Sequence, residues 1–238
     1  MTDPAMSAMN RLDPSERAAV GAEDAATRVA ELIQRLAPGV IHFAEHRSPK
    51  LSPPFDPTRD RYDGRPSRRP PLIVFGAHGT PWSQPLADVI AEVRQHGLVV
   101  WRHYPDPRAH PRATLFALAA EAAGTLGKFW TLTRELLHMR HDDLHAAMLR
   151  AGVDPERAWT TMGSGVGSER IVEDVAGAVA SGVAYAPALY VGDIRYRGEL
   201  DAASVSQALA AQPLGPSASS ALSDGASRRR RRSSERDR

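Results

Sequence analysis

Residues 72–90 read LIVFGAHGTPWSQPLADVI, and this stretch carries the clearest pattern of secondary structure in the chain. The apolar run at residues 72–75 predicts a buried strand, and the glycines that follow predict a turn. Apolar residues then return at helical spacing and predict a helix over residues 86–96. A helix that starts directly after a strand is a common place for reactive groups in α/β proteins. Here two hydroxyl residues, Thr80 and Ser83, stand at that start.

The segments on the C-terminal side continue an alternation of strands and helices. A second buried strand is predicted at residues 98–101, and a hairpin at residues 188–196 is closed by the turn Gly192-Asp193. Helices are predicted over residues 112–126, 129–139, 142–150 and 201–210, with further helices that start near residues 154 and 168. We therefore predict an α/β fold with a parallel β-α-β unit, an inserted helical lobe over about residues 109–180, and an antiparallel pair.

Composition shifts divide the chain into four parts. Residues 1–50 form an N-terminal extension with one helix, and residues 51–71 form an extended arm rich in Pro and Arg. Residues 72–212 form the α/β domain, and residues 213–238 form a disordered basic tail.

The extension is predicted to contain a helix over residues 14–36. Asp13 is a suitable N-cap, Pro14 suits the first helical position, and Glu16 completes a capping box. The apolar side of this helix must pack on something. It packs either on the chain's own body or on a partner or second copy, and the sequence leaves both open.

The charge is distributed unevenly along the chain. The net charge is +2, but residues 228–238 contain seven Arg and two acidic residues, which leaves the other residues slightly acidic. This distribution predicts no specific nucleic-acid surface on the body. No stretch has the roughly 18 consecutive apolar residues that a membrane span needs. The first 20 residues lack the apolar core of a secretory signal, so we expect a cytoplasmic protein.

Four stretches together carry a resemblance to a known family. They are FDPTRDRYDG (55–64), GAHGTPWSQ (76–84), the run from Val99 to Trp130, and SGVAYAPALYVGDIRYRGELDAASVSQAL (181–209). In this order they resemble the DsbA-like thioredoxin-fold family, and within it the thioredoxin-like domains found alone or fused behind sodium/proton antiporters. The resemblance implies a thioredoxin fold with an inserted helical lobe, and it covers roughly residues 54–210.

The resemblance also implies where the family's active site lies. Members carry a C-P-x-C motif at a helix N-terminus, where the helix end lowers the pKa of the first cysteine. Thr80 and Ser83 occupy the two cysteine positions here, and the chain contains no cysteine at all. Hydroxyls cannot form or exchange a disulfide. We therefore expect no thiol-disulfide oxidoreductase activity and no catalytic residue of that kind.

A second family feature is a cis-proline loop that pairs with extended peptide substrates. Pro187 matches this position, so the resemblance implies a groove at Ala186-Pro187 that binds a peptide or a segment of a protein partner. Trp82 and Tyr185 are expected to line the groove, and His78 is expected to pack near it. The function expected on this basis is that of a redox-inactive binding module, a pseudoenzyme without a cofactor.

Three alternatives remain open for the hydroxyl residues and their neighbours. Thr80 is structural if it caps the helix, with Pro81 at the first helical position. By resemblance to kappa-class glutathione transferases and related isomerases, Thr80 or Ser83 instead holds the thiolate of glutathione. In a third hypothesis His78 acts as a base that activates Thr80, although no group that would orient His78 is evident.

A further alternative concerns the whole protein. It is then purely structural and forms a homo-oligomer through the N-terminal helix.

A histidine-rich stretch raises the question of a metal site. His138, His141 and His145 have the spacing of one helix face, with Asp142 and Asp143 close by. The sequence RHDD at residues 140–143 instead indicates that one helix ends and another begins, which breaks the face. We therefore predict an exposed polar surface and no metal.

Overall fold

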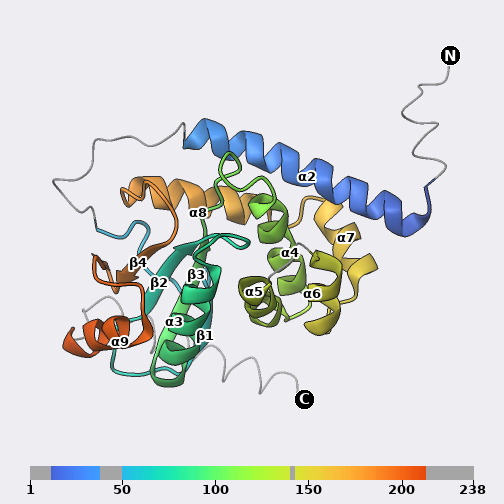
Figure 1. Ribbon diagram of the computed structural model, residues 1–238. Helices are drawn as coiled ribbons and strands as arrows, with labels where there is room; N and C mark the ends of the chain where they lie inside the picture. Colours follow the sequence, from blue (N-terminus) through green and yellow to red (C-terminus); the bar gives the residue numbers. More distant parts are fainter. Residues whose placement is uncertain (1–11, 38–49, 140–142, 213–238) are drawn as a thin grey trace, which may run out of the picture. The chain divides into compact units, whose positions relative to one another are not determined.

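The computed structural model describes residues 12–37, 50–139 and 143–212, which form two compact units (Figure 1). The helical unit consists of the described residues of Met1–Gly39, Ala77–Ser83 and Pro105–Ala176. The sheet unit consists of the described residues of Val40–Gly76, Gln84–Tyr104 and Gly177–Arg238. The predicted basic tail, residues 213–238, lies outside the described residues.

The sheet unit is built on one mixed sheet. Its strands are β1 (Arg61–Gly64), β2 (Leu72–Gly76), β3 (Leu98–His103), β4 (Ala188–Val191) and β5 (Ile194–Arg195), in the spatial order β1-β3-β2-β4-β5. β2 and β3 are parallel, whereas β1 pairs with β3, β4 with β2, and β5 with β4 in antiparallel fashion. The predicted parallel pair and the predicted hairpin are therefore confirmed.

Burial explains why the three middle strands read as continuous apolar runs. Every residue of β2, β3 and β4 is buried, as expected for strands that are covered on both faces. Two helices contribute apolar side chains to this unit. α3 (Ser83–His96) buries Leu86, Val89, Ile90 and Val93, and α9 (Ala202–Ala211) buries Val205 and Leu209.

The helical unit is organised around α4 (Ala113–Thr125). Its residues from Ala113 to Ala123 are all buried, and it packs against several other helices of the unit. These helices are α2 (Pro14–Leu36), α5 (Phe129–His138) and α7 (Pro155–Gly163), and α6 (Leu144–Arg150) packs on α5. α8 (Ser168–Ala180) begins in this unit and ends in the sheet unit. The predicted inserted helical lobe is therefore confirmed.

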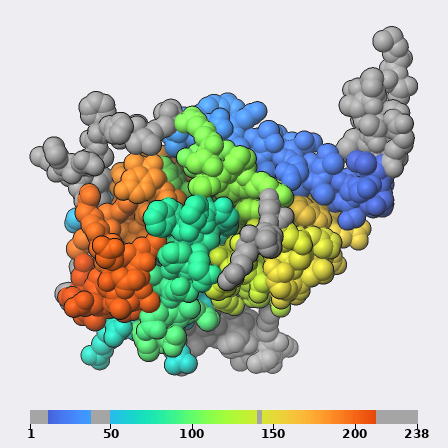
Figure 2. Space-filling view, viewed as in Figure 1, coloured from blue at the N-terminus to red at the C-terminus, as the bar shows by residue number. Residues whose placement is uncertain are grey.

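The N-terminal helix α2 has the predicted bounds and the predicted capping box. The Glu16 N–H donates to Asp13 Oδ1 at 2.8 Å, and the Asp13 N–H donates to Glu16 Oε2 at 2.9 Å. α2 packs on α7 (Figures 1 and 2), where a Cβ on Gly163 would lie only 3.3 Å from the carbonyl carbon of Gly21. The helix thus uses its apolar side within the chain, as one of the two predicted alternatives requires.

The extended arm over residues 51–71 contributes edge strand β1 to the sheet, a strand that its Pro- and Arg-rich composition does not predict. The predictions for the start of α3 need correction. The helix predicted over residues 86–96 begins three residues earlier, at Ser83. The interpretation of Thr80 as its N-cap is therefore wrong, since Thr80 lies three residues before the first helical residue.

The histidine-rich stretch lies at a helix boundary. His138 is the last residue of α5 and His145 is the second residue of α6, whereas His141 and Asp142 lie outside the described residues. Within residues 12–37, 50–139 and 143–212, no three His, Cys, Asp or Glu residues are grouped as a metal site requires. Over the same residues, no helix combines the length and the apolar character needed to cross a membrane.

Candidate functional site

The two hydroxyl residues at the start of α3 belong to one closed turn. The Thr80 N–H donates to Ser83 Oγ at 3.1 Å, and the Ser83 N–H donates to the Thr80 carbonyl oxygen at 3.0 Å. Ser83 is almost completely buried, whereas Thr80 is partly exposed. The Ser83 hydroxyl therefore serves the backbone of its own turn.

Pro85 explains why α3 begins at Ser83. Proline has no backbone N–H and cannot make the hydrogen bond that an interior helical residue needs. A helix that began at Pro81 would place Pro85 beyond the first turn, where that hydrogen bond is required. A start at Ser83 places Pro85 among the first residues, whose N–H groups have no partner inside the helix.

The turn before Thr80 requires glycine. Gly79 has φ +70°, and a Cβ at this position would lie 2.5 Å from the Phe116 ring. Only glycine combines this backbone conformation with so close a contact. His78, directly before it, is buried with 1% exposure, so its side chain is part of the interior rather than of the surface.

The aromatic residues predicted to bind a partner are both exposed. Trp82 has 51% of its surface exposed and Tyr185 has 66%, although large aromatic side chains are usually buried. Ala186 and Pro187 are half-buried, and the peptide bond between them is cis. Trp82 belongs to the helical unit, whereas Tyr185, Ala186 and Pro187 belong to the sheet unit. A common groove for them stays a prediction.

The loop that carries Tyr185 starts from a well-defined helix end. Gly182 has φ +69°, its N–H donates to the Val179 carbonyl at 3.0 Å, and the Val183 N–H donates to the Ala178 carbonyl at 2.9 Å. This is the Schellman arrangement, which satisfies carbonyls at the C-terminus of α8. The direction in which the chain leaves α8 is thereby set two residues before Tyr185.

Two tyrosine hydroxyls donate hydrogen bonds to the backbone of the same loop, and neither bond was predicted from the sequence. The Tyr104 hydroxyl donates to the Val183 carbonyl at 3.1 Å, and the Tyr190 hydroxyl donates to the Ser181 carbonyl at 2.6 Å. Both tyrosines are buried. Buried tyrosines usually find a partner for the hydroxyl, which was the only available signal in the sequence.

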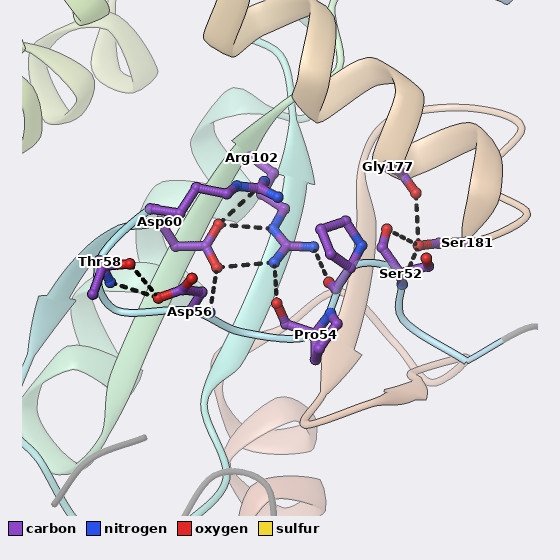
Figure 3. A network of polar contacts seen from close by, with 10 residues as sticks. Ser52, Pro54, Asp56, Thr58, Asp60, Arg102, Gly177 and Ser181 are labelled. Carbon is purple, nitrogen blue, oxygen red and sulfur yellow. Dashed lines mark hydrogen bonds and ion pairs between the residues drawn. The ribbon is translucent and has the colours of Figure 1, made fainter. Parts of the chain in front are cut away.

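Ser181 connects this loop to the arm (Figure 3). Its Oγ accepts the N–H of Ser52 at 2.8 Å and donates to the Gly177 carbonyl at 2.7 Å. Ser181 is completely buried and its bond to Gly177 is shielded from water, whereas the bond to the exposed Ser52 is partly buried. The start of the arm is thus fixed beside the end of α8.

A buried ion pair fixes the rest of the arm (Figure 3). The Arg102 guanidinium on β3 donates to both carboxylate oxygens of Asp60, at 3.0 Å from Nε and 2.9 Å from Nη2. It also donates to the carbonyls of Pro53 and Pro54, at 2.7 and 3.1 Å. Both side chains have no exposed surface. The arm is therefore an integral part of the sheet unit.

The chemistry available at these positions is limited. The sequence contains no cysteine, so neither a thiolate nor a disulfide can form. Each of the two loops presents one exposed aromatic side chain, Trp82 or Tyr185, on a backbone that is held by hydrogen bonds.

Comparisons with known sequences give a partial match to transport proteins. No family model matches the chain. The chain is 38% identical over 172 residues to the Na(+)/H(+) antiporter NhaA 1 of Mycolicibacterium gilvum, a match that covers 68% of the chain and 28% of that protein. It is 34% identical over 179 residues to the Na(+)/H(+) antiporter NhaA of Herminiimonas arsenicoxydans, covering 69% and 27%. The chain thus spans little more than a quarter of the length of these relatives.

Comparisons with solved structures identify the fold. BdbD from Bacillus subtilis matches with a TM-score of 0.58 and 13% identity, over 68% of this chain and 97% of that one. A periplasmic thioredoxin-like protein from Salmonella enterica serovar Typhimurium matches with a TM-score of 0.53 and 20% identity, over 66% and 91%. The catalytic domain of Proteus mirabilis ScsC matches with a TM-score of 0.51 and 15% identity, over 64% and 88%.

Proposed function

Since this chain has a DsbA-like thioredoxin fold and contains no cysteine, we propose that it is a redox-inactive module that binds an extended segment of a protein partner. The observation that carries the proposal is the exposure of Tyr185, 66%, on a loop held by buried hydrogen bonds. A rigid aromatic side chain loses little conformational entropy on binding and is a frequent energetic centre of protein interfaces.

The role of Ser83 supports a binding function over a catalytic one. Its Oγ accepts the Thr80 N–H, and the side chain is almost completely buried. A hydroxyl in this role stabilises the turn that presents Trp82. The turn then keeps the backbone shape needed at the start of α3 without the reactive sulfur that the two positions hold in thiol oxidoreductases of this fold.

The mode of binding follows from the loop around Pro187. By resemblance to the family, its backbone pairs with an extended segment, and neighbouring side chains contribute specificity. Tyr185 lies two residues before Pro187 and three before the first residue of β4. We assign to Tyr185 the main apolar contact with the partner, and to Trp82 an independent second contact.

The class of partner is proposed from the sequence relatives. Two thirds of this chain match a segment of proteins named as Na(+)/H(+) antiporters, and the rest of those proteins has no counterpart here. We therefore propose that the module associates with an antiporter of the NhaA type. We also propose that this association takes place on the cytoplasmic side of the membrane.

A capture experiment tests the proposal. The M. gilvum antiporter, without the segment that matches this chain, is purified in detergent and immobilised, and the full chain is passed over it. We expect retention of the wild-type chain, and loss of retention in Tyr185→Ala and in Trp82→Ala. Leu149→Ala, which removes a 57% exposed apolar side chain from α6, is the matched control and should be retained. Equal retention of all four proteins, or of none, contradicts the proposal.

A further inference from the structure

Three exposed arginines gather in one short loop of the sheet unit. Residues 65–71, RPSRRPP, join β1 to β2, and we call this segment the basic loop. Arg65, Arg68 and Arg69 are all exposed. Within the part of the chain that the structure describes, none of their three guanidinium groups is in a hydrogen bond or an ion pair.

The backbone of the basic loop is held in place. The Arg65 N–H donates to the Gly97 carbonyl, just beyond the end of α3, at 3.0 Å. The Arg69 N–H donates to Ser67 Oγ at 3.1 Å, which closes a local turn. Three of the seven residues are prolines, whose φ angle is fixed. The arginines are therefore presented together on a defined support.

The acidic side chains nearest to the loop in sequence do not neutralise it. Asp63 lies 2.9 Å from Arg94 Nε, and Asp60 is buried against Arg102. Each of these carboxylates is thus already paired with an arginine outside the loop. The positive charge of the basic loop faces solvent and is available to an external anion.

We propose that the basic loop docks the protein on an anionic phospholipid surface. A guanidinium group can donate two parallel hydrogen bonds to phosphate oxygens, and clustered basic residues attract anionic headgroups electrostatically. An acidic peptide fits less well, because prolines supply no N–H and the loop cannot offer a continuous set of backbone donors. This inference does not rest on the proposed function, since a lipid surface needs no protein partner.

Vesicle flotation tests the docking surface with the full chain. Vesicles of phosphatidylcholine alone are compared with vesicles that also contain phosphatidylglycerol, at low salt. The variant with Arg65, Arg68 and Arg69 all changed to Gln keeps side-chain length and removes three charges. A matched variant changes Arg228, Arg229 and Arg230 to Gln and controls for the loss of three charges elsewhere. Thermal unfolding confirms that each variant is folded.

We expect binding to the phosphatidylglycerol vesicles only, and about 100-fold weaker binding in the loop variant, from about fivefold for each arginine. The other triple variant should keep most of the affinity, and added salt should weaken binding. Equal affinity of the loop variant and the wild type overturns the proposal. So does binding of soluble polyglutamate without binding of the vesicles, which would indicate an acidic protein partner.

Discussion

Phe75 of β2 and Ala188 of β4 face each other in an antiparallel pair. Phe75 is followed by Gly76 and then by the segment that leads to Thr80, and Ala188 is preceded directly by Pro187. The segment with the hydroxyl residues and the proline loop are therefore attached to the same end of the sheet. The antiparallel pairing from Leu72 opposite Val191 to Phe75 opposite Ala188 fixes these two attachment points relative to each other.

The turn before Thr80 should not tolerate a side chain at Gly79. An alanine there needs an unfavourable positive φ, at about 1–2 kcal/mol, and its Cβ would overlap the Phe116 ring. We expect Gly79→Ala to lower the free energy of unfolding by about 2–4 kcal/mol in urea titrations. Gly127→Ala is the control, since Gly127 has the same φ of +70° with nothing within 4 Å of a Cβ. An equal loss in the free energy of unfolding in Gly79→Ala and Gly127→Ala would show that the contact with the Phe116 ring contributes nothing.

The buried ion pair that holds the arm should be costly to break. In Asp60→Ala the Arg102 guanidinium loses its carboxylate while it stays buried, and we expect a loss of about 3–5 kcal/mol in the free energy of unfolding. The more exposed pair Arg150–Glu135, at 2.8 Å, provides a comparison. Arg150→Ala should cost less than about 1 kcal/mol. If Asp60→Ala costs no more than Arg150→Ala, the arm is not fixed as described.

Asp56 should show a pH dependence with a definite sign. Hydrogen bonds from the Thr58 hydroxyl and N–H, in that order, hold the pKa of Asp56 below its ordinary value of 3.8. A depressed pKa means that the ionised form stabilises the fold above pH 3.8, and that this contribution disappears as the pH falls through the lower folded-state pKa. In Thr58→Val the pKa of Asp56 should rise towards 3.8 in an NMR titration. An unchanged pKa would contradict the assignment.

Reduced glutathione should not stabilise the protein. A ligand at about 100 times its Kd adds about 2.7 kcal/mol of stability, which a thermal-shift titration detects easily. We expect no shift, because Ser83 is almost completely buried and its Oγ already accepts the Thr80 N–H. A saturable shift that disappears in Thr80→Val or Ser83→Ala would instead favour a glutathione-dependent transferase or isomerase.

Elements defined by local patterns could be predicted from the sequence with little error. The bounds of α2 follow from a capping box and a helical apolar stripe, and the bounds of β4 follow from an apolar run that ends at a Gly-Asp turn. β1 could not be predicted, because RYDG has no apolar alternation and is a strand only through its pairing with β3. The predicted start of α3 lies three residues too late, because the apolar stripe begins only at Leu86 and the residues from Ser83 to Pro85 carry no helical apolar pattern.

The residues that support the candidate site were harder to find. Ser52 and Ser181 are 129 residues apart in sequence, and no local pattern relates them. Arg102 directly follows the strand predicted at residues 98–101, and a charged residue beside a buried strand needs an opposite charge. Nothing in the sequence distinguishes Asp60 from the other acidic residues. The exposure of Trp82 and Tyr185 likewise depends on the tertiary structure.

The affinity of the module for an NhaA-type antiporter is the decisive measurement for the proposed binding function. The dissociation constants of the wild type, Tyr185→Ala and Leu149→Ala are measured for the M. gilvum antiporter without its matching segment, reconstituted in neutral lipid discs to remove any contribution from anionic headgroups. We expect saturable binding that is at least about tenfold weaker in Tyr185→Ala and unchanged in Leu149→Ala. Absence of binding, or the same constant for all three proteins, would contradict the proposed function.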